Sequence, residues 1–233
     1  MELTPEMSAF AILGGGFVIG LRHALDADHL AAVSAIVTDR KSLWTSSIVG
    51  GLWGVGHTMS LLFVGSAVIF LKVGISESVE AYLEAAVGAM LVLLGLNVLR
   101  KLLAAERIHA HEHSHEGHIH AHIHVHEPGE TPAAHHGFSP RSVIVGMVHG
   151  LAGSAGLMLL VLPTIELPSL ALLFILIFGI GSIGGMMAMS LLMGLPLYLT
   201  ASRFELVNKG LRVIAGVFSL LWGAVLIHEK LIA

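Results

Sequence analysis

A run of charged and imidazole side chains interrupts the first apolar stretch of the chain. It reads Arg22-His23-Ala24-Leu25-Asp26-Ala27-Asp28-His29 and supplies two imidazoles and two carboxylates within eight residues. Two imidazoles with one or two carboxylates suit a borderline divalent metal ion such as nickel, cobalt or zinc, whereas calcium and magnesium prefer shells made of oxygen. We therefore expect His23, Asp26, Asp28 and His29 to form a metal site.

A straight helix cannot direct all of these side chains to one ion. At about 100° per residue, His23, Asp26 and His29 fall on one stripe roughly 120° wide, and Asp28 points to the opposite side. The helix must unwind or kink to gather His23, Asp28 and His29 around one ion. We therefore expect a discontinuous first helix, a device found at the midplane of many transporters.

The alternative is an ion-pair network that holds no metal. A charge at the centre of a membrane helix costs roughly 2.5–3.5 kcal/mol, so three unpaired charges cost about 7–10 kcal/mol, comparable to the stability of a whole protein. Arg22 is expected to act as a counter-ion to an aspartate rather than as a ligand. The run could also lie near the membrane surface, where charges cost little. A bound cation is favoured, because ionisable clusters inside membranes are usually functional.

Two further histidines lie in apolar segments. His57 follows the glycine-containing run Trp53-Gly54-Val55-Gly56, and His149 lies in the run Gly146-Met147-Val148-His149-Gly150. His57 is expected to bind the metal or to support its ligands, and His149 is expected to complete the site or to line the transport path. The alternative for each is a hydrogen-bonded histidine of the protein core.

The composition predicts that lipid surrounds much of the chain. Of the 233 residues, 55% are hydrophobic and only 12% are charged, against roughly 25% charged residues in soluble domains. The net charge of −4 argues against nucleic-acid binding, and the absence of cysteine excludes thiolate metal sites. A membrane-spanning helix needs about 20 apolar residues. Six stretches meet or nearly meet this length: 8–37, 43–71, 80–103, 141–162, 168–199 and 206–232.

The two halves of the chain resemble each other. Each half carries three of the six stretches, so the second half enters the membrane from the opposite side. The pattern predicts an all-α polytopic membrane protein of six transmembrane helices, built as two inverted three-helix repeats with a site where the repeats meet. Three segments of the first half recur in the second at offsets of 126, 125 and 128 residues: Gly20–His23 with Gly146–His149, Trp53–Gly56 with Phe178–Gly181, and Gly88–Gly95 with Gly216–Gly223.

A polar, histidine-rich segment at 104–141 separates the predicted repeats at 1–103 and 142–233. Such tracts bind divalent metal ions at neutral pH, so we expect the segment to buffer or sense metal. The alternative is a solvated linker whose histidines titrate near pH 6.5. Eleven histidines lie in it: His109, His111, His113, His115, His118, His120, His122, His124, His126, His135 and His136.

The distribution of lysine and arginine predicts the orientation. Nine of these residues lie in loops on one side of the predicted helices, and only Lys72 and Lys230 lie on the other. Cytoplasmic loops carry the excess of positive charge. We therefore expect a multi-pass plasma-membrane protein with both termini outside and the histidine-rich segment in the cytoplasm.

The run from Arg22 to His29 resembles the signature of the nickel/cobalt transporter family, Arg-His-Ala-x-Asp-Ala-Asp-His, without a gap. Gly56-His57-Thr58 is similar to the glycine-histidine element in the next helix of that family. The segment 148–156 lacks the Asp-Thr motif of the longer members and is similar to a shorter branch described as urease-accessory-type membrane proteins. The resemblance implies that the residues of the run bind the metal, with His57 close by.

The resemblance also implies a function. The favoured one is a secondary transporter that moves Ni²⁺ or Co²⁺, with Zn²⁺ as a further candidate, without a resident cofactor and without enzymatic activity. One alternative is a membrane sensor or accessory protein that hands nickel to a maturing metalloenzyme. Another is a membrane metalloenzyme with histidine boxes, which is disfavoured because the dense histidine tract lies in a linker. Glycine-rich helix faces would also allow a homo-oligomer.

Overall fold

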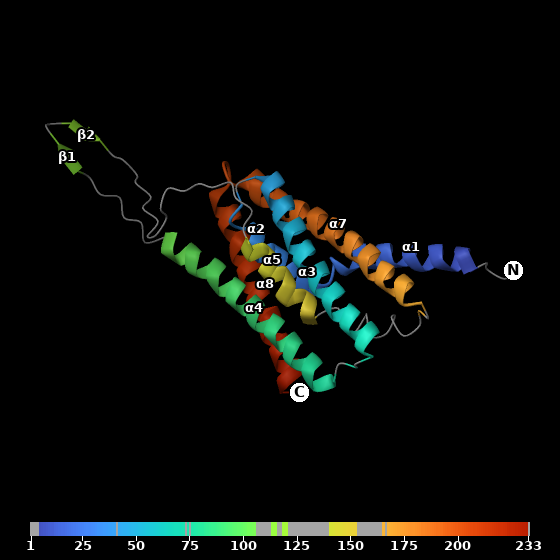
Figure 1. Ribbon diagram of the computed structural model, residues 1–233. Helices are drawn as coiled ribbons and strands as arrows, with labels where there is room; N and C mark the ends of the chain where they lie inside the picture. Colours follow the sequence, from blue (N-terminus) through green and yellow to red (C-terminus); the bar gives the residue numbers. More distant parts are fainter. Residues whose placement is uncertain are drawn as a thin grey trace.

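The computed structural model describes residues 5–40, 42–72, 74, 76–105, 113–115, 118–120, 140–152, 165 and 167–232. Nearly all of these residues are helical (Figure 1). The helices are α1 (Pro5–His23), α2 (Ala27–Val37), α3 (Leu43–Leu71), α4 (Glu77–Ala105), α5 (Pro140–Ala152), α7 (Pro168–Thr200) and α8 (Glu205–Leu231).

Four of these helices, α3, α4, α7 and α8, are long and apolar enough to cross a membrane. The pair α1 and α2 passes the same test as one span that is bent by 54° at its break. These elements agree with five of the six stretches predicted from the sequence. The fourth stretch begins as α5, which has 13 residues, and its remainder lies outside the described residues.

The only strands among the described residues belong to the histidine-rich segment. Strand β1 (His113–His115) pairs with β2 (His118–His120) in antiparallel register, with His113 opposite His120. This hairpin lies apart from the helices (Figure 1). The predictions for the other histidines of the segment fall on residues that the structure does not describe.

The surface of the helical bundle is apolar, as lipid requires. Large hydrophobic side chains such as Phe63, Leu93 and Ile214 are exposed, while serines, histidines and glycines occupy buried positions between the helices. This arrangement reverses that of soluble proteins, which rarely expose large contiguous apolar patches. Together with the length of the helices, it identifies a membrane protein.

Glycines allow helices of the two halves to approach backbone to backbone. Helix α1 packs on α7, and α5 packs on α3. A methyl group added at Gly20 of α1 would lie 2.1 Å from the carbonyl oxygen of Phe178, and one added at Gly146 of α5 would lie 2.0 Å from that of Trp53. In the alignment of the two halves, Gly20 corresponds to Gly146 and Phe178 to Trp53, so the two contacts are equivalent.

A second pair of equivalent contacts lies in the same two interfaces. An added methyl group at Gly181 would lie 2.3 Å from the carbonyl oxygen of Phe17, and one at Gly56 would lie 2.1 Å from that of Val143. Only glycine permits such close approach of two backbones. The positions of α1 and α5, which carry His23 and His149, are therefore fixed by contacts with the other half of the chain.

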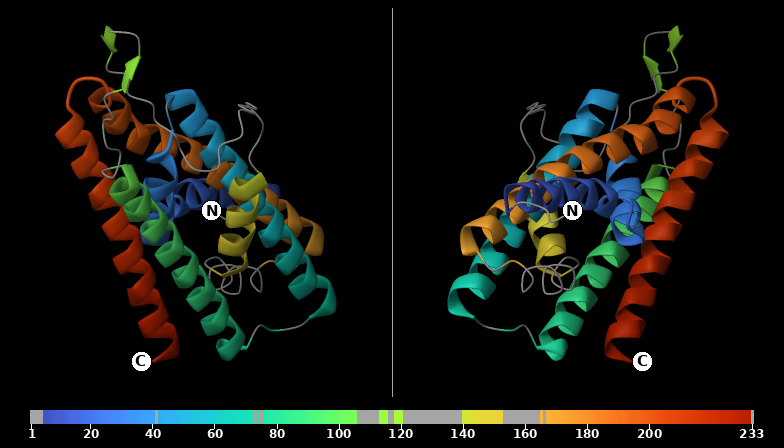
Figure 2. Two further views of the ribbon diagram at one scale, coloured as in Figure 1. Left: turned by 90° about the vertical axis from the view of Figure 1, so that its left-hand side faces the viewer. Right: turned by 90° about the vertical axis from the view of Figure 1, so that its right-hand side faces the viewer.

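Helices α4 and α8 run side by side along one flank of the bundle (Figure 2). Gly88 and Gly223 face each other, and an added methyl group at Gly223 would lie 2.4 Å from the carbonyl oxygen of Gly88. Farther along, the Ser219 hydroxyl donates a hydrogen bond to the Leu91 carbonyl at 2.8 Å. This pair also packs against α2 and so supports the second half of the bent span.

Gly20→Ala and Gly146→Ala are each expected to destabilise the protein by about 1–3 kcal/mol, because the obstructing atoms belong to the backbone and cannot rotate away. The matched control is Gly15→Ala in α1, where nothing lies within 4 Å of an added methyl group. This control should be neutral or stabilising by up to about 1 kcal/mol, since alanine favours the helix. Thermal unfolding in detergent micelles measures the difference. Equal midpoints for Gly20→Ala and Gly15→Ala would contradict the helix contacts described above.

Candidate metal site

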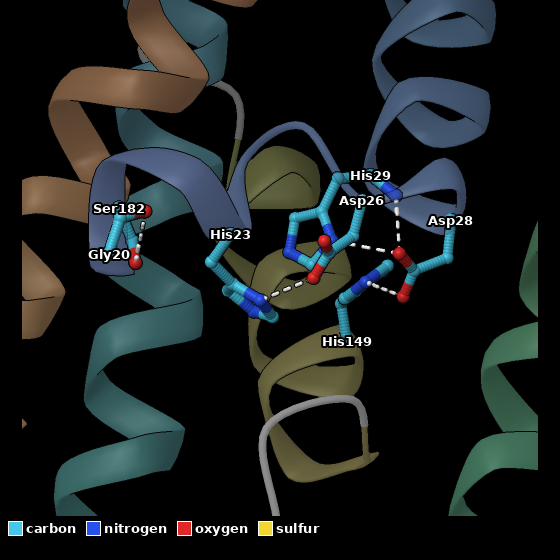
Figure 3. A network of polar contacts seen from close by, with 7 residues as sticks. All are labelled: Gly20, His23, Asp26, Asp28, His29, His149 and Ser182. Carbon is cyan, nitrogen blue, oxygen red and sulfur yellow. Dashed lines mark hydrogen bonds and ion pairs between the residues drawn. The ribbon is translucent and has the colours of Figure 1, made fainter. Parts of the chain in front are cut away.

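The chain turns sharply between α1 and α2. Helix α1 ends at His23, after which the backbone N–H groups of Leu25 and Asp26 donate to the carbonyls of Arg22 and His23 at 2.8 and 3.1 Å. Asp26 then adopts an extended conformation as the residue preceding α2. The predicted interruption of the first helix is thus confirmed. The break places the side chains of Asp26 and His29 beside that of His23 (Figure 3).

Four buried histidines from four helices meet at this break. They are His23 of α1, His29 of α2, His57 of α3 and His149 of α5, with exposures of 3, 0, 0 and 0%. The centroid of the His29 ring lies 4.4 Å from that of His23, 5.3 Å from that of His57 and 4.2 Å from that of His149. His29 therefore occupies the centre of the cluster.

Several ring nitrogens in this cluster have no hydrogen-bond partner among the described residues. They are Nε2 of His23, Nε2 of His29 and both nitrogens of His57. Buried polar atoms are almost always hydrogen-bonded, so such a group needs an explanation. One ligand atom from each of these three histidines lies within 4.8 Å of the others. A transition-metal ion holds imidazole nitrogens at about 2.0–2.1 Å, so the three rings need to draw together only slightly to share one ion.

Two aspartates orient two of these rings. The Nδ1 of His23 lies 2.7 Å from Oδ2 of Asp26, and the Nδ1 of His29 lies 3.0 Å from Oδ1 of Asp28 (Figure 3). An imidazole that donates its Nδ1–H to a carboxylate keeps a lone pair on Nε2, which is the usual arrangement of metal-binding histidines. In both cases, Nε2 is the nitrogen that has no partner.

The Asp28 carboxylate also joins the two halves of the chain. Its Oδ1 accepts the backbone N–H of His29 at 2.9 Å, and its Oδ2 lies 2.9 Å from Nε2 of His149. Ligand atoms of Asp28, His29 and His149 form a second group within 4.8 Å of one another. His29 therefore belongs to both groups.

Two aromatic rings border the cluster of buried histidines. The Trp53 ring centroid lies 5.2 Å from that of His29 and 5.3 Å from that of His149, and the Phe178 ring lies 5.4 Å from that of His23. Neither residue was predicted to lie at the site. The spacing of Trp53 and His57, four residues apart on one helix, was the signal that places them on one face.

The structure brings all six predicted site residues together: His23, Asp26, Asp28, His29, His57 and His149. It differs from the sequence interpretation in the partners of the aspartates. The Arg22 side chain is exposed, and within the described part of the chain it has no carboxylate at ion-pair distance. The described residues therefore do not support the expected role of Arg22 as a counter-ion. Among them, both aspartates contact histidines, because the break turns the two carboxylates toward the buried rings.

Comparison with known proteins found several relatives of this chain. It is 37% identical over 218 residues to the urease accessory protein UreH of Bacillus sp. (strain TB-90), covering 94% of this chain and 91% of that protein. A high-affinity nickel transport protein of Cupriavidus necator is 31% identical over 81 residues, or 34% of this chain and 22% of that protein. The chloroplast protein FOR GROWTH AND FERTILITY 2 of Arabidopsis thaliana is 27% identical over 183 residues, or 77% and 46% of the two chains. No family model and no solved structure matches the chain.

The geometry predicts different effects for a ligand and for an orienting carboxylate. His57→Ala should lower the affinity for Ni²⁺ about 100-fold or more, whereas Asp26→Ala should lower it about 10–100-fold, the range found when a residue that supports a ligand is lost. The reporter is quenching of Trp53 fluorescence by bound Ni²⁺ in a chain whose other tryptophans, Trp44 and Trp222, are replaced by phenylalanine. Trp53 touches the cluster, so this signal reports metal bound among the buried histidines.

The matched control is His228→Ala, which removes an exposed histidine of α8 and should leave the affinity unchanged. If Asp26→Ala weakens binding as much as His57→Ala, Asp26 is itself a ligand and the assignment of roles is wrong. Unchanged quenching in His57→Ala would show that the group of His23, His29 and His57 is not the binding site.

Proposed function

This chain belongs to the family of the urease accessory protein UreH, a relative of the nickel/cobalt transporters, and from this premise we propose that it carries Ni²⁺ or Co²⁺ across a membrane. The observation that supports the proposal most strongly is the group of buried ring nitrogens on His23, His29 and His57. They converge from three helices and have no hydrogen-bond partner among the described residues. Imidazole ligands suit nickel, cobalt and zinc.

The charges around the group also favour a divalent cation. A divalent ion bound by three neutral imidazoles alone would carry two unbalanced positive charges inside the membrane, where an unpaired charge is costly. Asp26 and Asp28 each lie one hydrogen bond away from a ligand ring and together carry two negative charges. The loaded site is therefore formally neutral. A monovalent or trivalent ion would leave one charge unbalanced.

We further propose that the two halves form an inverted repeat of six spans, of which α5 begins the fourth. The support is the equivalence of their contacts, since Gly20 meets Phe178 as Gly146 meets Trp53. In this arrangement, the first helix of each half packs against the second helix of the other. The site then lies where the halves meet, as in transporters that alternate access by rocking one repeat against the other.

The loops supply the argument for the proposed orientation. Nine lysines and arginines on one side against two on the other favour a plasma-membrane protein whose termini lie outside and whose histidine-rich segment lies in the cytoplasm. In this proposal, the segment buffers metal beside the transport path. The metal ion is cargo, and the protein has no resident cofactor and no catalytic role.

A second candidate is delivery of nickel to a metalloenzyme. It is supported by the relative that is described as a urease accessory protein. Delivery requires a partner protein to take the ion, and the histidine-rich segment is where a partner could reach it. The four buried histidines are enclosed by helices and suit passage through the protein better than transfer to a partner.

Purified protein in sealed liposomes is expected to move Ni²⁺ or Co²⁺ down a concentration gradient, and His23→Ala should reduce this flux at least about 10-fold, because it removes one ligand ring. The measurement is the fluorescence of a metal indicator trapped inside the liposomes. His228→Ala, which changes a histidine outside the cluster, should transport like the natural protein.

A variant in which a short flexible linker replaces residues 106–139 separates the two candidate functions. Transport through the buried cluster should persist in this variant, whereas delivery from the segment should fail. Metal binding without flux in the natural protein would contradict the transporter proposal and favour delivery.

A further inference from the structure

His29 stands between two different groups of ligand atoms. Its Nδ1 lies 3.0 Å from Oδ1 of Asp28, and its Nε2 has no hydrogen-bond partner in the described residues. The first group joins His29 to His23 and His57, and the second joins it to Asp28 and His149. His29 is therefore shared by the two groups, and its ring carries two nitrogens that can serve as ligands.

The second group has the composition of a metal site in its own right. Two imidazoles and one carboxylate are a recurrent ligand set for divalent transition metals. His149 is fully buried, and its Nδ1 has no hydrogen-bond partner within the described ranges. That unpartnered nitrogen, together with the 2.9 Å approach of its Nε2 to Asp28, is unusual for a histidine that merely fills a core.

The two groups differ in the helices that build them. His23, His29 and His57 come from α1, α2 and α3, which all belong to the first half of the chain. Asp28, His29 and His149 include α5 of the second half. Helix α5 packs backbone to backbone on α3. A movement of these two helices against α2 therefore changes the distance between His149 and Asp28 as well as the distance between His57 and His29.

We propose that Asp28, His29 and His149 form a second metal station, which is used in alternation with the station formed by His23, His29 and His57. One ion occupies one station at a time, because the neutral His29 ring has a single nitrogen with a lone pair. The role of the second station in transport rests on the proposed function, whereas its ability to bind metal does not.

The transfer of the ion between stations conserves protons. In the empty protein, the His29 proton is on Nδ1 and the His149 proton is on Nε2, both facing Asp28. When the ion enters the second station, the His29 proton moves to Nε2 and the His149 proton moves to Nδ1. Each ring then presents a lone pair to the ion, and neither ring changes its charge.

The test uses the full chain with Trp53 as its single tryptophan and Co²⁺ as the probe. His57→Ala, which disables only the first station, should retain a weaker binding event that still quenches Trp53. Adding His149→Gln to this variant should lower the remaining affinity for Co²⁺ by a further factor of about 10 or more, because it removes one member of the second station. Glutamine keeps an amide donor for Asp28 but removes the imidazole ligand.

The single variant His149→Gln supplies the second comparison. Its equilibrium affinity should stay within about threefold of that of the natural protein, because the first station is intact, while its flux should fall about 10-fold or more. His228→Ala is the matched control for both measurements. If His149→Gln does not fold, as judged by size-exclusion profile and thermal midpoint, His149→Leu provides the same comparison.

Three results would overturn the second station. They are residual binding in His57→Ala that does not respond to His149→Gln, complete loss of binding in His57→Ala alone, and a loss of affinity in His149→Gln as large as that in His57→Ala. The last result would assign all four histidines to one site. If the affinities of the variants agree with these expectations but the natural protein moves no metal, the second station is supported and the transporter proposal fails.

Discussion

The contacts between two aspartates and two histidines at the break of the first span determine what the buried cluster can do. Asp26 holds Nδ1 of His23 at 2.7 Å and Asp28 holds Nδ1 of His29 at 3.0 Å. Without these contacts, each ring could rotate or carry its proton on either nitrogen. With them, both Nε2 atoms stay free of hydrogen bonds and remain near His57. The preorganisation of the group formed by His23, His29 and His57 therefore originates in carboxylates that are not among its ligands.

The break itself makes these contacts available. Asp26 precedes α2 and Asp28 lies in its first turn, where the partial positive charge of the helix N-terminus stabilises anions. The Asp28 carboxylate can remain charged because it accepts hydrogen bonds from the backbone of His29 and from two rings, whereas the Asp26 side chain is exposed. Glycine contacts at Gly20 and Gly146 then fix α1 and α5 against the other half, so that His23 and His149 reach the same place.

Much of this arrangement could be predicted from the sequence, because it depends on periodicity. The apolar stretches predicted six spans, five of which agree with the described helices, and the position of Asp28 on the wrong face of a straight helix predicted the break. The correspondence of His149 with His23 in the two halves predicted that both would lie near the centre. What could not be predicted was the direction of individual side chains. The turn of Asp26 toward His23, the exposure of Arg22 and the contact of Trp53 with two rings depend on the backbone angles of the break, which no periodicity encodes.

The location of the bound ion tests the central claim most directly. A structure of the nickel-loaded protein, with anomalous scattering measured at the nickel edge, would place the ion among the side chains without any substitution. We expect an anomalous peak inside the bundle, bonded to His29 and to its neighbours in the cluster. Peaks confined to the histidine-rich segment, with none among the four buried histidines of a fully loaded protein, would contradict a metal site at the break of the first span.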